Sequence, residues 1–81
     1  MSVEIIDPAY LTAQQWTDFM TPNLEQFGNI GRLGREEEWR LWGAQLLNVP
    51  ALSGNIVPDP YLFDDWRTWA QRLCANLSEM P

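Results

Sequence analysis

Two segments of this chain repeat one pattern, and that pattern limits the fold more than any other feature of the sequence. Each segment reads acid-acid-Trp-Arg-x-Trp-small-x-x-Leu, from Glu37 to Leu46 and from Asp64 to Leu73. Tryptophans three residues apart lie on one face of a helix, together with the small residue and the leucine that follow. The repeat therefore predicts two amphipathic helices that pack in a similar way.

The two predicted helices differ in their apolar faces. The later one, within residues 61–80, has a single apolar stripe about 100° wide. Its members are Trp66, Trp69, Ala70, Leu73, Leu77 and Met80. The earlier one, over 35–47, also carries Leu41, which lies roughly 160° around the helix from the tryptophans. This helix therefore either lies between two layers or exposes the leucine to a partner. Its Gly43 lowers helix propensity by about 1 kcal/mol relative to alanine, so we expect a bulky group packed closely against that position.

The N-terminal half contains signals for an arm and two short helices. Residues 1–11 include an Asp-Pro step, which favours extended or turn backbone, and we expect an arm there. Thr12 and Gln15 have the spacing of a capping box, which predicts a helix over about 12–20. A Thr-Pro step then favours a second short helix over 22–27, ended by the next glycine.

These signals predict an all-α fold, a single small helical domain of three to four helices over residues 1–81. An extended N-terminal arm (1–11) precedes helices within 12–47. A long irregular linker (48–60) contains three prolines and a glycine, and a C-terminal amphipathic helix (61–80) follows it. Irregular connections of this length are usually functional or packed against something. The apolar residues of the linker indicate that it packs, either over the helices or across to a neighbouring chain.

Composition limits both the source of stability and the chemistry. An 81-residue chain buries a small core, and such domains gain stability from disulfides, metals or partner chains. Cys74 is the single cysteine and histidine is absent, so an internal disulfide and a Cys/His zinc site are excluded. We therefore expect an oligomeric assembly, and the alternative is a monomer stabilised by its five tryptophans. We expect Cys74 to be a small buried hydrophobic residue. Without histidine or lysine, we predict no catalytic residues, no cofactor, no metal and no enzymatic activity.

The net charge of -6 excludes several partner classes. Eleven acidic residues stand against five basic ones, all of them arginine, so the chain offers no basic surface to neutralise nucleic-acid phosphates. The same charge repels anionic membrane surfaces, and no apolar run reaches the roughly 20 residues that span a bilayer. The N-terminus lacks the features of a secretory signal. We predict neither nucleic-acid nor membrane binding, and synthesis in a cytoplasm.

The tryptophan pairs have three interpretations. They form the chain's own core, a protein interface, or a platform that stacks on sugar rings. Arg40 and Arg67, between the rings, are most simply solvent-side partners of nearby acids, and interface salt bridges are the alternative. For an interface, we predict one set of partner-binding residues. They are Trp39, Leu41, Trp42, Gly43, Leu46, Trp66, Trp69, Leu73 and Leu77.

The segment P-D-P-Y-L-F-D-D-W-R-T-W-A-Q-R-L, residues 58–73, resembles helices in small virion proteins of tailed bacteriophages. The resemblance implies an adaptor or connector in the head, neck, tail or fibre-attachment region, made in the host cytoplasm and located in the virion. It also implies that the C-terminal helix docks on other virion proteins or on copies of itself, while the arm and the linker reach neighbouring subunits. The alternatives are a small acidic inhibitor of the anti-defence type that binds a basic protein surface, and a sugar-binding module.

Overall fold

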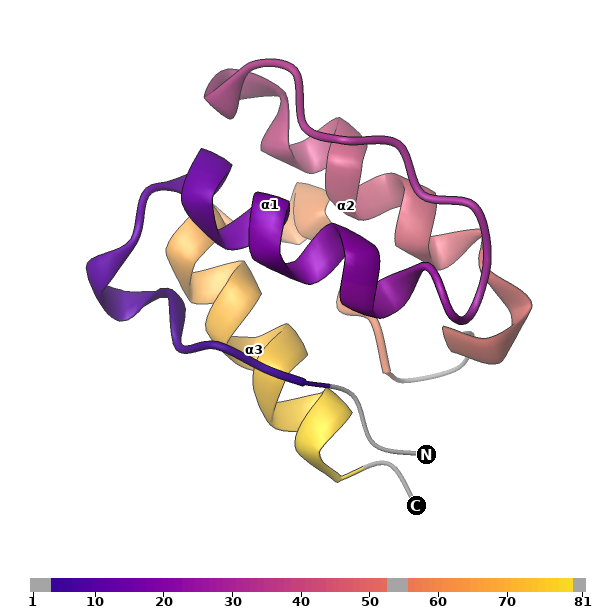
Figure 1. Ribbon diagram of the computed structural model, residues 1–81. Coiled ribbons are helices and arrows are strands. Elements are labelled where there is room, and N and C mark those ends of the chain that lie inside the picture. Colours follow the sequence, from indigo (N-terminus) through magenta and orange to yellow (C-terminus); the bar gives the residue numbers. More distant parts are fainter. Residues whose placement is uncertain (1–3, 53–55, 80–81) are drawn as a thin grey trace.

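Three α-helices form the fold, α1 (Ala13–Leu24), α2 (Trp39–Leu47) and α3 (Trp66–Ser78) (Figure 1). The computed structural model describes residues 4–52 and 56–79, and across these residues it contains no strand. Four short 3-10 turns accompany the helices. They are η1 (Pro8–Tyr10), η2 (Glu36–Glu38), η3 (Pro50–Leu52) and η4 (Pro60–Leu62). The all-α prediction is confirmed. Within the described ranges, no helix has the length and apolar character needed to cross a membrane.

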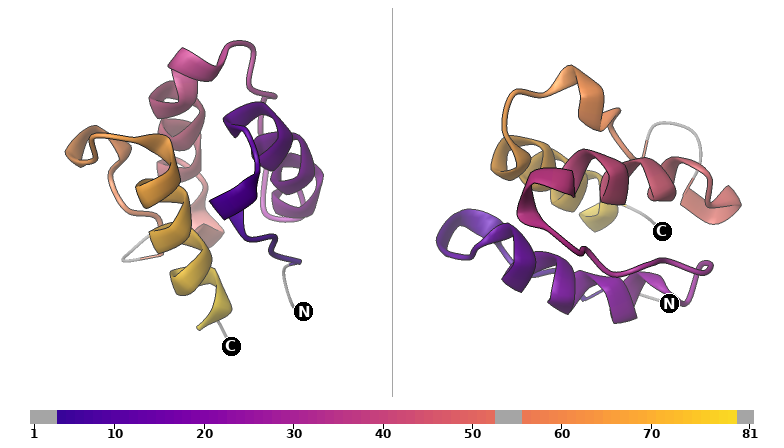
Figure 2. Two further views of the ribbon diagram at one scale, coloured as in Figure 1. Left: turned by 90° about the vertical axis from the view of Figure 1, so that its left-hand side faces the viewer. Right: turned by 90° about the horizontal axis from the view of Figure 1, so that it is seen from above.

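The helices surround one core rather than forming layers. Figure 2 shows α1, α2 and α3 on different sides of a common centre, and the loop 25–35 running back between α1 and α2. The buried face of α1 carries Trp16, Met20 and Leu24, none of which exposes any surface. Because each helix contributes one apolar face, the core lies where the three faces meet.

Helix α1 begins as predicted and ends later. The Thr12 hydroxyl accepts a hydrogen bond from the Gln15 amide, and the Gln15 side chain accepts one from the Thr12 amide, so the capping box is confirmed. The helix then continues through Pro22 to Leu24, and the prediction of a separate helix over 22–27 is wrong. Proline so close to the helix end removes a single backbone hydrogen bond, which burial of Leu24 offsets.

The two tryptophan helices start with different caps. The acidic residues before α2 form the separate turn η2, so the regular helix begins at Trp39 within the expected 35–47. Helix α3 begins at Trp66 rather than near 61, because the Asp65 side chain caps it by accepting from the Thr68 amide. The hydrogen bonds to Thr68 lower the pKa of the Asp65 carboxyl.

The described parts of the arm and the linker pack on their own chain. Turn η1 contacts α3, and its Pro8 is buried. In the linker, Leu52 and Val57 belong to the core. The described linker residues therefore pack over the chain's own helices, which is one of the two expected arrangements, and contact of the arm and the linker with neighbouring subunits stays a prediction. Arm residues 1–3, linker residues 53–55 and Met80 at the end of the predicted stripe lie outside the described residues.

Candidate functional site

The predicted partner-binding residues lie mainly in the chain's own core. Seven of the nine are buried: Trp39, Trp42, Gly43, Leu46, Trp69, Leu73 and Leu77. Trp66 is half-buried, and Leu41, at 59% exposure, faces solvent, which is one of the two arrangements that its position in the helix allowed. These seven residues are therefore covered by their own chain, and Leu41 and part of Trp66 stay accessible to a partner. Sugar stacking on the buried rings is excluded for the same reason.

Three tryptophans, one from each helix, meet at the centre of the core. Trp16, Trp42 and Trp69 each occupy the fourth position of their helix, and we call them the inner tryptophans. Their ring centroids are 5.6 Å apart for Trp16–Trp42 and 6.1 Å for the other two pairs. The rings cross at 71°, 82° and 89°. These are edge-to-face geometries, which place the positive edge of one ring against the negative face of another. The trio thus has approximate threefold symmetry.

The symmetry extends along the helices. The fifth position is Thr17, Gly43 or Ala70, and the eighth is Met20, Leu46 or Leu73. All six residues are buried. Helix α1 is therefore a third copy of the packing template that the sequence shows clearly only in α2 and α3. The repeat was incomplete in the sequence because α1 has Ala13 and Gln14 where the other helices have Trp and Arg.

The two outer tryptophans, Trp39 and Trp66, open α2 and α3 and repeat one contact. Trp66 packs on Trp16 at 6.1 Å and 42°, and Trp39 packs on Trp69 at 6.0 Å and 42°. Each outer ring therefore lies against the inner ring of the next helix in a cyclic order. Ala13 holds the corresponding position in α1.

Arg40 and Arg67 bind main-chain carbonyls. Arg67 donates to Pro8 O at 3.1 Å and Leu11 O at 2.8 Å, and Arg40 donates to Phe63 O at 2.7 Å. Each guanidinium also stacks on its neighbouring outer tryptophan, 4.4 Å from the centroid for Arg40 and 4.7 Å for Arg67. Neither forms an ion pair within the described residues. The solvent-side pairing with acids is therefore wrong, and each arginine instead fastens the segment that precedes another helix.

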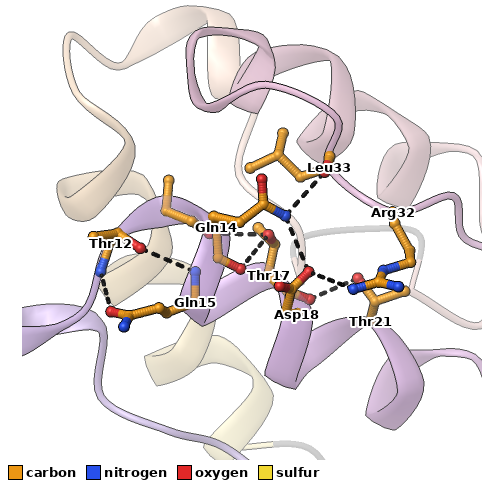
Figure 3. A network of polar contacts seen from close by, with 9 residues as sticks. Thr12, Gln14, Gln15, Thr17, Asp18, Thr21, Arg32 and Leu33 are labelled. Carbon is orange, nitrogen blue, oxygen red and sulfur yellow. Dashed lines mark hydrogen bonds and ion pairs between the residues drawn. The ribbon is translucent and has the colours of Figure 1, made fainter.

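Gln14, in α1, likewise binds a main-chain carbonyl in the segment that precedes another helix (Figure 3). Its side-chain amide donates to Leu33 O and to the Asp18 carboxylate, both at 3.0 Å, and Asp18 also pairs with Arg32 at 3.2 Å. The hydrogen bonds from Gln14 and Arg32 lower the pKa of Asp18. Thus α3 holds the segment before α1, α1 holds the segment before α2, and α2 holds the segment before α3.

Two Asp-Pro turns complete the pattern, and sequence reasoning missed their relation. Asp7 and Asp59 cap η1 and η4, and the carbonyl immediately before each aspartate accepts from an inner tryptophan. Trp16 Nε1 donates to Ile6 O at 3.0 Å, and Trp69 Nε1 donates to Pro58 O at 2.8 Å. The signal was present, since an Asp-Pro step precedes each of these tryptophans by nine or ten positions. No such step precedes Trp42, whose buried Nε1 has no hydrogen-bond partner among the described residues.

Removal of Arg67 should destabilise the fold more than its position on a helix surface implies. Charge-assisted hydrogen bonds contribute about 1.5–3 kcal/mol each, so we expect Arg67→Ala to lower the free energy of unfolding by about 2–3 kcal/mol. Arg67→Lys should recover less than half of the loss, because lysine lacks the planar fork. Urea unfolding followed by circular dichroism measures both. Arg72→Ala, at an exposed position of the same helix, is the control. An equal loss of unfolding free energy in that variant would contradict a stabilising role for the hydrogen bonds of Arg67 to Pro8 O and Leu11 O.

Cys74 is a buried hydrophobic residue, as predicted. The residue is 9% exposed, and its sulfur lies 3.7 Å from Ile6 O. Burial raises the pKa of Cys74 to about 11, against a weaker opposing contribution from Trp16. A thiol held in its neutral form is a poor nucleophile. The described residues also contain no cluster of acidic and cysteine side chains that could hold a metal ion.

The exposed apolar side chains are the remaining candidates for partner contact. Tyr10 and Leu62 take the third position of η1 and η4 and are 94% and 81% exposed. Tyr61 and Leu41 are also largely exposed. Tyrosine is enriched at protein interfaces, and turns fixed to a core keep such side chains in place. Comparison with known proteins adds nothing to this assignment, since no family model, curated sequence or solved structure matches the chain.

Proposed function

We propose that the chain is a non-enzymatic assembly protein of a phage virion, an adaptor that packs against neighbouring subunits in the head, neck, tail or fibre-attachment region. The observation that carries the proposal is the placement of exposed apolar residues on turns fixed to an interlocked core. Tyr10 and Leu62 occupy matched positions on η1 and η4. Side chains held in this way can repeat one contact in every copy of an assembly. The phage context rests on the resemblance of residues 58–73 to virion helices.

Purified virions test the proposal by mass spectrometry. The chain should appear at a fixed ratio to the major structural proteins, and its absence from the particles would refute the virion assignment. Tyr10→Ser with Leu62→Ser should reduce its incorporation while leaving the fold intact, because both side chains are more than four-fifths exposed. Arg72→Ser, also exposed, is the matched control and should be incorporated normally.

A second candidate, from another class, is a small acidic inhibitor that binds a basic protein surface. The net charge of -6 favours it, because electrostatic complementarity accelerates association with a basic partner. An inhibitor would be found in infected cells bound to its target and not in particles. The same mass spectrometry therefore separates the two candidates.

A further inference from the structure

A groove lies between α2 and the loop 31–34. Its other wall consists of Glu38, the last residue of η2, and of Leu41, Trp42 and Gln45 in α2, four positions with the spacing of one helix face. Its volume is about 270 Å³. An engineered apolar cavity of ~150 Å³ is large enough for benzene, so the groove has room for one long side chain.

Hydrogen bonds on both sides hold the loop that forms the groove wall. The Gln45 side chain accepts from Gly31 N at 2.7 Å and donates to Gly31 O at 3.1 Å. On the other side of the loop, Gln14 donates to Leu33 O (Figure 3). The groove is therefore formed before any ligand arrives, which lowers the entropy lost on binding.

The groove also marks where the threefold pattern is broken. The indole N–H groups of Trp16 and Trp69 donate to carbonyl oxygens that lie ten and eleven positions earlier in the chain. The position eleven residues before Trp42 is Gly31, and its carbonyl is bound to Gln45 instead. Gln45 thus binds the loop before α2 at Gly31. The groove lies beside this loop, whereas an Asp-Pro turn precedes each of the other two helices.

The charges at the groove favour a cation. Arg32 is paired with Asp18, and the Gln45 amide is occupied by Gly31. The Glu38 carboxylate, in contrast, has no hydrogen bond or ion pair among residues 4–52 and 56–79, while the Glu38 backbone amide donates to Arg35 O. Its Oε1 lies 3.6 Å from the point that a Cβ at Gly34 would occupy, so the carboxylate extends toward the loop across the groove.

We infer that the groove binds a lysine or arginine side chain of a partner protein, with the methylene stem on Leu41 and the cation at Glu38. Leu41, at 59% exposure, supplies apolar surface, and long basic side chains bury their stems while the charged end stays near water. The net charge of -6 attracts basic partners over a longer range. The inference rests on the proposed assembly role for the identity of the partner, and it names the chemistry of that partner.

Three capped tripeptides, Ac-Ala-X-Ala-amide with X as lysine, norleucine or glutamate, test the groove by NMR titration. The lysine peptide should shift the Leu41 methyl and the Gly34 amide, and norleucine, which keeps the stem without the charge, should bind more weakly. The glutamate peptide should not bind. Glu38→Gln should weaken lysine-peptide binding by roughly two- to fivefold, the range of exposed ion pairs. Glu37→Gln, in the same turn but outside the groove, is the control.

Two results would overturn the inference. Equal binding of the lysine and norleucine peptides, or a lysine peptide insensitive to Glu38→Gln, would reduce the groove to an apolar surface. Absence of any shift at Leu41 and Gly34 would remove the site altogether. Because the titration uses purified chain, it is independent of virion composition. Absence of the chain from particles would refute the virion role and leave the measured groove chemistry unchanged.

Discussion

Alanine at position 43 should destabilise the protein although alanine is the better helix former. A Cβ on Gly43 would lie 2.7 Å from Trp69 Cζ2, 2.9 Å from Trp69 Cη2 and 3.3 Å from the Cβ of Pro60. Trp69 is 1% exposed, and its indole N–H donates a hydrogen bond to Pro58 O, so the ring has no room to move aside. Overpacking typically costs about 1–3 kcal/mol, which exceeds the ~1 kcal/mol gain in helix propensity.

We expect a net loss of about 1–2 kcal/mol for Gly43→Ala and of more than about 3 kcal/mol for Gly43→Val, whose two further methyl groups enter the same contact. Gly34→Ala is the matched control. The added Cβ there meets only Glu38 Oε1 at 3.6 Å, an ordinary contact, so the variant should be neutral or slightly stabilised. Urea unfolding of the three variants measures the effect. A Gly43→Ala protein as stable as the wild type would show that Trp69 can shift.

The sequence was informative wherever one local pattern decided the structure. The capping box at Thr12, the buried Cys74 and the close contact at Gly43 followed from helix geometry and residue size. The end of α1 could not be predicted in this way, because a proline near the C-terminus of one helix and a proline at the start of the next give the same local sequence pattern. Burial of Leu24, a tertiary effect, decides between them.

The roles of the arginines and of Asp-Pro turns required the three-dimensional arrangement. Arg67 and its acceptor Leu11 are 56 positions apart, and nothing in the local pattern distinguishes a main-chain carbonyl from a nearby carboxylate as the partner. The partner-binding residues show a related limit, since seven of the nine are packed within their own chain. An apolar helix face predicts burial, but whether the chain itself or another protein covers that face depends on how the helices meet.

Replacing the inner tryptophans one at a time with phenylalanine should separate a hydrogen-bonded indole from one without a partner. Each substitution removes a similar part of a buried ring from the same cluster, so the losses from packing should be alike. Trp16→Phe and Trp69→Phe also remove the indole donors to Ile6 O and Pro58 O, and Ile6 O then keeps only the weak thiol donor of Cys74. Trp42→Phe removes an Nε1 that is buried without a hydrogen-bond partner among the described residues.

A buried polar group left unsatisfied costs about 1–3 kcal/mol. We therefore expect losses of about 2–4 kcal/mol for Trp16→Phe and Trp69→Phe. For Trp42→Phe, relief of the unpaired donor should offset the lost packing and hold the loss to about 1 kcal/mol or less. Far-UV circular dichroism in urea measures all three without depending on tryptophan fluorescence. Equal losses would mean that the Trp42 N–H has a partner after all, such as the face of a neighbouring indole, 5.6 Å away between the Trp16 and Trp42 centroids. Unequal losses in the expected order would show that the threefold cluster is stabilised through two of its three tryptophan donors.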